Sequence, residues 1–314
     1  MKRLLFKAAP FVFVALALLA AAYAVSKHAS ELDDIFGRLA IVSIAGSILL
    51  GMAGVFLTLL MWCELLRGLG APVPTGEASK VFFVSQLGKY LPGSVWPVVA
   101  QMEYGRRTGI GRRTMLTANA LTLALSLVAG LILAAIVLPF SSSHALADYW
   151  WALACLPVLL IALHPRVVPG VLDWLFRRLG RESIDQRLSA ASLFRAVGWA
   201  FTSWLLLGLH LLVLVQAVGV HGSHAVAAAI GGFSLAACAG VLFIPAPAGA
   251  GIRDAVLIAA LGASMGSTTA LALGLASRVL LIVVDLLVAL LATISQPLLK
   301  RSQLTPVRSD SNSD

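Results

Sequence analysis

The stretch QLGKYLPGSVWPVVAQMEYGRR, residues 86–107, decides the fold class because it continues an apolar run and then breaks it. Lys89 lies inside the run, and Pro92 and Pro97 follow it within the nine residues 89–97. A regular spanning helix does not combine a charge with two prolines, because proline removes a backbone hydrogen bond and a charge is costly in hydrocarbon. A loop in water does not hold this much Val, Trp and Leu. The stretch therefore predicts irregular backbone inside a membrane protein.

The composition of the whole chain agrees with a membrane location. Of the 314 residues, 60% are hydrophobic and 12% are charged, and the mean hydropathy is +0.94. A soluble domain is about 25% charged, so this chain cannot cover its surface with polar atoms, and that surface must face lipid. The net charge of +9 is explained by basic cytoplasmic loops, and no nucleic-acid motif accompanies it, so we expect no nucleic-acid partner.

The apolar runs predict an all-α polytopic bundle of about eight membrane segments. A spanning helix needs about 20 apolar residues. Six segments are predicted to cross completely, and two more, 81–105 and 225–264, are predicted to enter and return as Pro/Gly-broken re-entrant elements. The predicted crossings are 8–26, 39–62, 115–139, 149–163, 196–219 and a span within 268–299. We expect a single transmembrane domain over residues 1–299 and a disordered cytoplasmic tail over residues 300–314.

Basic residues predict the orientation of the chain. Lys and Arg concentrate before the first run, around the stretch 86–107, in the segment 164–195 and at the C-terminus, and are scarce in the other loops. The positive-inside rule places the basic loops in the cytoplasm. We therefore expect a multi-pass protein of the cytoplasmic membrane with both termini inside the cell.

The broken stretch has a counterpart near the C-terminus. Pro247-Ala248-Gly249-Ala250-Gly251 matches Pro92-Gly93-Ser94, and an apolar approach precedes each while polar or charged residues follow. Interrupted apolar segments at matching places in two halves point to a transport site. The alternative is that each Pro-Gly merely marks a turn at the membrane interface.

Ionisable residues inside the predicted membrane region are few, and they are functional candidates because such charges are costly. Three bases oppose two acids, which leaves one positive charge for an anion, and the fork of an arginine suits a phosphate. Arg278 and Asp285 share one helical face and are expected to pair with residues on other elements. The alternative is a set of structural ion pairs. The five residues are Lys89, Arg253, Asp254, Arg278 and Asp285.

No constellation in the sequence indicates catalysis or metal binding. The chain has no Walker loop and no Ser/His/Asp arrangement, and its histidines are dispersed. The three cysteines, Cys63, Cys155 and Cys238, are far apart and are expected to be buried thiols. We therefore expect a protein that is not an enzyme and that holds no cofactor or metal.

Two stretches carry a family resemblance that extends over about residues 8–298. LGKYLPGSVWPVVAQMEYGRRTGI (87–110) and IPAPAGAGIRDAVLIAALGASMG (244–266) resemble the signature regions of the lysylphosphatidylglycerol synthase transmembrane-region family of flippase-like membrane proteins. The resemblance implies translocation of an anionic or phosphate-linked lipid, which is aminoacylated, glycosylated or polyprenyl-linked. It also implies that a separate lipid synthetase or glycosyltransferase acts with the chain, because no synthetase domain follows residue 298.

On this hypothesis membrane lipids are the partners, and their headgroup binds between the two broken elements. Bases contact the phosphate, and carboxylates balance charge or contact a cationic headgroup. Glycine N–H groups donate to the anion, and the other polar residues complete the lining. The alternatives are a non-catalytic scaffold for a separate enzyme and a secondary transporter of a small anion. The predicted substrate-binding residues are Lys89, Pro92, Gly93, Ser94, Gln101, Glu103, Pro247, Gly249, Gly251, Arg253, Asp254, Arg278 and Asp285.

Overall fold

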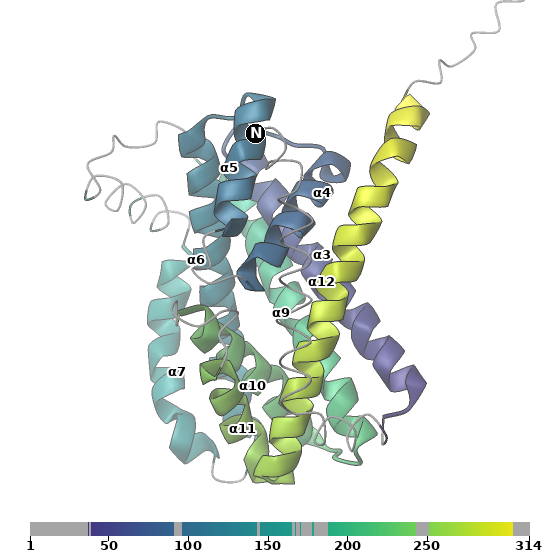
Figure 1. Cartoon of the computed structure of the whole chain (residues 1–314). Coiled ribbons are helices and arrows are strands. Elements are labelled where there is room, and N and C mark those ends of the chain that lie inside the picture. Colours follow the sequence, from purple (N-terminus) through teal and green to yellow (C-terminus); the bar gives the residue numbers. More distant parts are fainter. Residues whose placement is uncertain are drawn as a thin grey trace, which may run out of the picture.

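The structure is a computed structural model (Figure 1). It describes residues 39–90, 96–142, 145–164, 188–242 and 251–303, together with the single residues 37, 167, 170 and 178. Within these residues all the regular structure is helical. The predicted first crossing, 8–26, and the tail beyond residue 303 lie outside the described residues.

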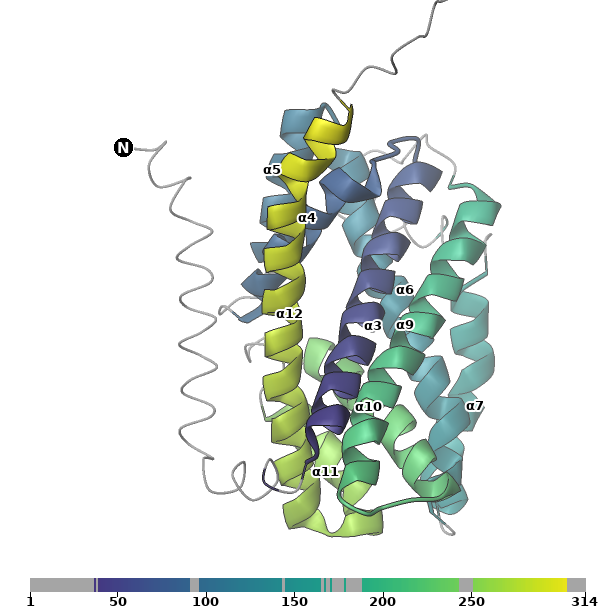
Figure 2. The same ribbon diagram turned by 90° about the vertical axis from the view of Figure 1, so that its right-hand side faces the viewer.

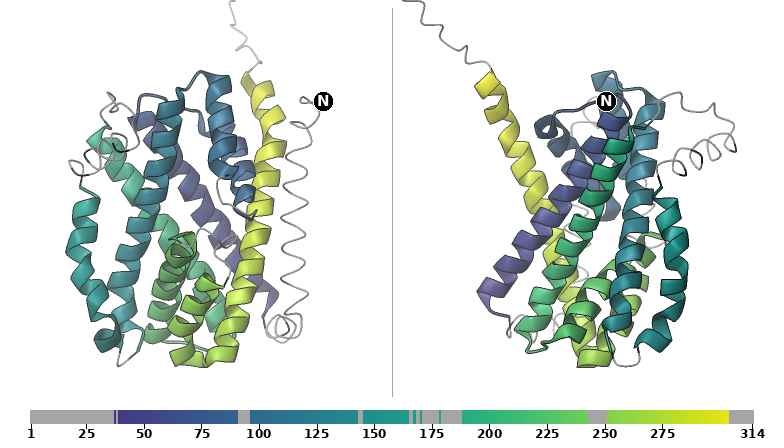
Figure 3. Two further views of the ribbon diagram at one scale, coloured as in Figure 1. Left: turned by 60° about the vertical axis from the view of Figure 1, so that its left-hand side comes forward. Right: turned by 180° about the vertical axis from the view of Figure 1, so that it is seen from behind.

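The long helices form a bundle that confirms the predicted fold class. Five of the described helices are long and apolar enough to cross a membrane: α3 (Ile41–Gly68), α6 (Arg112–Val137) with the 3₁₀ turn η2 (Leu138–Phe140), α9 (Ala190–Ala217), α10 (Ser223–Leu242) and α12 (Ser267–Gln303). Helix α7 (Ala145–Ala162) is shorter and flanks α6 at the edge of the bundle (Figure 3). The chain is an integral membrane protein by these criteria.

The two segments predicted to enter and return form helical hairpins at opposite ends of the bundle (Figure 1). The first consists of α4 (Thr75–Gln86), the 3₁₀ turn η1 (Leu87–Tyr90) and α5 (Trp96–Thr108). The second consists of α10 and α11 (Ile252–Met265). The described ends of both hairpins that adjoin 91–95 and 243–250 lie at middle depth, so each hairpin penetrates only part of the bundle.

Small residues let the two limbs of each hairpin approach closely. A Cβ atom on Gly88 would lie 2.8 Å from the Trp96 Cβ of α5. A Cβ atom on Gly232 of α10 would lie 2.7 Å from the Ala260 Cβ of α11. Real Cβ atoms do not approach this closely, so a larger residue at either position would push the limbs apart.

The core of the bundle lies between α3 and α9, which pack along most of their length (Figure 2). Trp62, Leu65 and Leu66 of α3 are fully buried there. Helix α12 crosses this core and contacts α3, α4 and α11, so it touches both hairpins. Helix α12 therefore packs against both the α4–η1–α5 hairpin and the α10–α11 hairpin.

The outer surface is apolar where lipid is expected. Helix α7 exposes Val158, Leu160 and Ile161. Cys155 is also exposed on this helix, whereas Cys63 and Cys238 are buried, so the expectation of three buried thiols was wrong for Cys155. The apolar character of Cys155's neighbours could not distinguish burial in protein from exposure to lipid, because both environments select apolar residues.

One end of the bundle is basic. The C-terminal ends of α3 and α5 and the N-terminal ends of α6 and α9 meet there (Figure 1). They carry Arg67, Arg106, Arg112 and Arg195. Arg195 pairs with the buried Glu64 of α3 at 2.7 Å and ties α9 to α3 at this end.

Helix α12 also runs past the predicted domain boundary. The helix ends at Gln303, whereas we expected the disordered tail to begin at residue 300. The boundary was drawn where the apolar run ends, whereas the helix continues through Pro297 and into the polar residues that follow.

We expect Gly232→Ala to destabilise the protein relative to Gly198→Ala. The added methyl group at position 232 collides with Ala260, whereas Gly198 of α9 has no atom within 4 Å of its Cβ position. Overpacking of this kind costs about 1–3 kcal/mol. Thermal unfolding in detergent should therefore show a midpoint several degrees lower for G232A than for G198A. Equal midpoints for the two variants would contradict the close packing of α10 on α11.

Candidate headgroup cavity

A cavity of about 570 Å³ lies at middle depth, where the two hairpins face each other. Residues of α3, α4, η1, α5, α6, α9, α10, α11 and α12 line it, so among the elements with given bounds only α7 and η2 do not contribute. Its wall is mostly apolar and aromatic, with polar groups at a few places. The polar and charged lining residues are Thr58, Gln86, Lys89, Tyr90, Gln101, Asn119, Thr122, Ser126, Arg253, Arg278 and Asp285.

Asp285 of α12 holds the end of the first hairpin. Its side chain is almost completely buried, and its Oδ2 atom lies 2.7 Å from the Lys89 ammonium. The Tyr90 hydroxyl donates a hydrogen bond to the same oxygen. Both partners belong to η1. The Lys89 charge can lie inside the bundle because the opposite charge of Asp285 compensates it there.

Arg278 of α12 holds the second hairpin in the same way. Its Nη1 atom lies 3.0 Å from Oδ2 of Asp254 in the first turn of α11. The same Oδ2 accepts a hydrogen bond from the Gly251 N–H at 3.1 Å, which caps the start of α11. Gly251 has a φ of +88°, a conformation that favours glycine.

The Gly251 N–H is therefore not available as a donor to a bound anion. We expected this group to line the site, but Asp254 already accepts its hydrogen bond, and neither residue lines the cavity. Asp254 is the third residue of α11, and an acid at this position commonly caps the start of its own helix. The sequence prediction placed Asp254 in the cavity and did not consider this cap.

Arg253 differs from the other bases of the cavity. Its guanidinium lies 5.1 Å above the centre of the Phe233 ring of α10. Its Nη2 atom is buried and has no hydrogen-bond partner among the described residues. Because Lys89 and Arg278 are paired with acids, the positive charge in excess is that of Arg253. A buried donor without a partner is costly, and a bound anion would satisfy it.

A second unsatisfied donor lies across the cavity on α6. The Trp62 indole N–H donates to Oδ1 of Asn119 at 2.8 Å and so fixes the orientation of this amide. The amide nitrogen of Asn119 is buried and has no partner among the described residues. Gln101 of α5 is buried as well, but its amide nitrogen bonds to the Ser85 hydroxyl at 3.0 Å.

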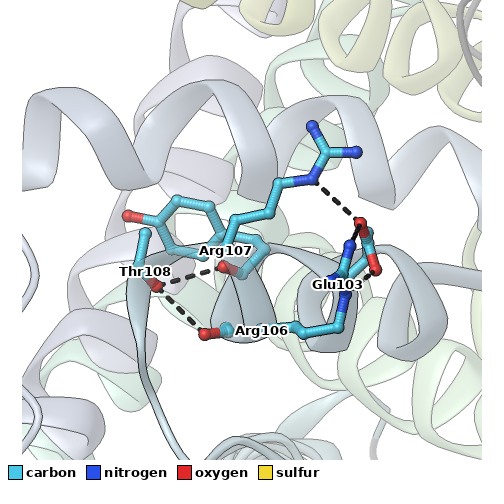
Figure 4. A network of polar contacts seen from close by, with 6 residues as sticks. Glu103, Arg106, Arg107 and Thr108 are labelled. Carbon is cyan, nitrogen blue, oxygen red and sulfur yellow. Dashed lines mark hydrogen bonds and ion pairs between the residues drawn. The ribbon is translucent and has the colours of Figure 1, made fainter.

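Glu103, which was predicted to complete the polar lining, does not line this cavity. It lies near the outer end of α5 and accepts hydrogen bonds from Arg106 at 2.8 Å and Arg107 at 2.9 Å (Figure 4). These hydrogen bonds lower the pKa of Glu103 to about 2, so the carboxylate is ionised at cellular pH. Gln101, which lines the cavity, lies two residues before Glu103, and about 200° of helix rotation separates the two side chains, so Glu103 points away from the cavity.

The cavity opens sideways through an apolar mouth. Leu123 of α6 and Val241 of α10 line it, yet 52% and 47% of their surfaces are exposed. Val99 of α5, next to the lining residue Val98, is 54% exposed. Apolar side chains that are exposed on helices long enough to span a membrane are expected to face lipid, so we expect the cavity to open toward hydrocarbon here.

The structure thus gathers five predicted residues in one cavity. Lys89, Gln101, Arg253, Arg278 and Asp285 line it, and Asp254 supports it through Arg278. Pro92, Gly93, Ser94, Pro247 and Gly249 lie outside the described residues.

The sequence analysis missed Tyr90 and Asn119. Tyr90 follows Lys89 directly in the broken stretch, and a neighbouring phenol is a natural partner for the same acid. Asn119, Thr122 and Ser126 recur at helical spacing within an uncharged run and all line the cavity. A polar stripe of this kind in a spanning helix is a signal that could have identified this wall.

A sequence model described as the lysylphosphatidylglycerol synthase TM region matches residues 8–289 of the chain. The chain belongs to this family. The match includes both hairpins and the two charged residues of α12, so it confirms the resemblance expected from the two motifs. A comparison with curated proteins found no matching relative.

We expect Asp285→Asn to destabilise the bundle and Lys89→Met to relieve part of that loss. The first change leaves the Lys89 charge at the cavity without its acid, and the second removes that charge. Because Lys89 is partly exposed, a coupling of about 1–3 kcal/mol is reasonable, below the value for a fully buried pair.

The measurement is a double-mutant cycle of thermal unfolding in detergent, with Glu103→Gln as an exposed control that leaves the midpoint nearly unchanged. Additive effects of D285N and K89M would show that the pair does not hold η1 against α12.

Proposed function

We propose that this protein is a lipid translocase that moves an anionic, phosphate-linked lipid across the cytoplasmic membrane. The lipid headgroup would bind in the cavity between the hairpins while its chains stay in the bilayer. The family, the membrane fold and the charge of the cavity support this proposal. The chain itself would not catalyse a reaction, and a separate lipid synthetase or glycosyltransferase would supply the lipid.

The observation that carries the proposal is the buried Nη2 atom of Arg253, which has no hydrogen-bond partner among the described residues. Arg253 lines the cavity, and the described ion pairs leave its charge uncompensated. A phosphodiester supplies one negative charge and oxygens that match the guanidinium fork. Such hydrogen bonds are strong in a site of low dielectric constant.

The position of the mouth favours a lipid over a small soluble anion. A free anion needs a path lined by water or polar groups, whereas exposed Leu123 and Val241 border this opening. An acyl or polyprenyl chain can pass between these residues and remain in hydrocarbon. The arrangement lets the headgroup alone enter the polar cavity.

The opposite entry of the two hairpins supports movement between the two faces of the membrane. One hairpin comes from each end of the bundle (Figure 3), and residues of both hairpins line one cavity. A small shift of either hairpin against α12 would open the cavity toward one face. On the positive-inside rule the basic end of the bundle is cytoplasmic, and both termini would lie on that side.

We expect Arg253→Gln to reduce lipid translocation strongly, whereas Arg106→Gln should have little effect. Both changes remove one guanidinium, but Arg106 lies on the exposed end of α5 and does not line the cavity. Loss of charge-assisted hydrogen bonds worth about 1.5–3 kcal/mol lowers phosphate binding roughly 10- to 100-fold. The measurement is headgroup accessibility of labelled phosphatidylglycerol in proteoliposomes that contain the full chain.

Three results would speak against the proposal. Full translocation by R253Q would remove the role of Arg253. Uptake of radioactive inorganic phosphate by the same vesicles, without lipid movement, would favour a transporter of small anions. If wild-type vesicles move neither, and the chain binds a synthetase or glycosyltransferase instead, it is a scaffold.

A further inference from the structure

We propose, on the basis of the translocase function above, that the group attached to the lipid phosphate is an uncharged polyol or sugar and not a cationic aminoacyl group. The attached group would occupy the part of the cavity that the phosphate bound at Arg253 leaves free. Two independent features support an uncharged group there, the state of the two carboxylates and the neutral donor on α6.

Both carboxylates near the cavity are already neutralised. Asp285 accepts from Lys89 and Tyr90, and Asp254 accepts from Arg278 and Gly251. A cationic headgroup would have to displace one of these partners or stay unpaired. Displacement would release a base into the cavity, and an unpaired cation in a buried site is costly.

The sequence that joins the two limbs of each hairpin contains no further acid. The stretches 91–95 and 243–250, which connect the limbs of the two hairpins, read LPGSV and FIPAPAGA and contain no ionisable side chain. The described lining contains Lys89, Arg253 and Arg278 against Asp285 alone. Because Asp254 is paired with Arg278, the charge in excess is the single positive charge of Arg253, which one bound phosphodiester cancels, so a further cation would have no partner.

The neutral donor is suited to a hydroxyl group. Asn119 presents a buried amide N–H that lacks a partner among the described residues, and the Trp62 hydrogen bond holds it in place. Gln86 of α4 lines the same cavity. A hydroxyl group can accept a hydrogen bond from an amide N–H without introducing charge. A site with buried donors discriminates strongly against ligands that lack the matching acceptor, because its donors would then stay unpaired.

The aromatic wall and the volume also suit a polyol. Trp62, Phe82, Trp204 and Phe233 line the cavity, so its wall is partly aromatic, as is common in sites for organic ligands. Its volume of about 570 Å³ falls within the range of roughly 300–1,000 Å³ that is typical of sites for small organic ligands. A phosphate alone would leave most of this space unfilled.

The test compares lipids that share one phosphodiester and differ only in the attached group. The probes are phosphatidylethanol, phosphatidylglycerol, phosphatidylinositol and lysylphosphatidylglycerol, and binding to the purified full chain is measured by native mass spectrometry. Phosphatidylglycerol and phosphatidylinositol should bind about 3- to 10-fold more tightly than phosphatidylethanol, because each adds hydroxyl acceptors for an unsatisfied donor. Lysylphosphatidylglycerol should bind at least about 10-fold more weakly than phosphatidylglycerol.

Two substitutions at Asn119 separate hydrogen bonding from charge. Asn119→Leu should abolish the advantage of phosphatidylglycerol and leave phosphatidylethanol binding unchanged. Asn119→Asp keeps the acceptor for Trp62 and replaces the amide N–H with a carboxylate oxygen. N119D should therefore reverse the preference and improve binding of lysylphosphatidylglycerol by about 10-fold relative to phosphatidylglycerol.

The outcomes distinguish this inference from the function on which it rests. If the wild-type chain binds lysylphosphatidylglycerol as tightly as phosphatidylglycerol, the headgroup inference is wrong although the translocase proposal stands. If phosphatidylethanol binds as tightly as the polyol lipids, the role of Asn119 is wrong. If none of the four lipids binds, and Arg253→Gln changes nothing, the translocase proposal itself fails. The wild-type comparison decides the matter even where a variant does not fold.

Discussion

The arrangement of this protein depends on two opposite charges on one face of α12. Arg278 and Asp285 lie seven residues apart, about two helical turns, and each is paired with a different hairpin. A charge inside a membrane protein requires a partner, because hydrocarbon solvates it poorly. The carboxylate of Asp285 can stay buried because Lys89 of η1 pairs with it. Arg278 has its partner Asp254 only when α11 packs against α12. The same electrostatic requirement thus positions two chain segments that are far apart in sequence, and it brings their ends to one depth.

The cavity is a consequence of this constraint. Helical hairpins that enter from opposite ends and stop midway leave space between their ends, and α3, α6 and α9 close this space at the sides. The ion pairs consume both acids and two of the three bases, so the net charge that remains at the cavity is the one on Arg253. Exposed apolar residues border the opening toward lipid, whereas the donors lie deep inside. A polar interior with an apolar mouth separates the two chemical halves of an amphipathic molecule, and this separation is the physical basis of the proposed function.

Much of this arrangement was predictable from particular residues. The prolines and glycines of the stretches 86–107 and 244–251 predicted two elements that enter and return, and the spacing of Arg278 and Asp285 predicted that both face other elements. Glu103 was predicted to line the site because it follows the broken stretch closely, but α5 carries it toward the basic end, where Arg106 and Arg107 surround it. Gly251 was predicted to donate to an anion, but Asp254 accepts its N–H. In both cases the residue type was a sound candidate, and a local partner within four residues had already satisfied it.

Hydropathy and backbone chemistry within single segments are enough to predict a helical membrane protein, the places where its helices are interrupted and the charges that need partners inside the bilayer. Only the packing of the helices shows which acid pairs with which base, that Arg253 keeps an unsatisfied nitrogen, and that a hydrogen bond from Trp62 fixes the amide of Asn119. These pairings join residues up to 196 positions apart, from Lys89 to Asp285. Any of the three bases could satisfy either acid as far as sequence is concerned, and only the packing of both hairpins against α12 selects among them.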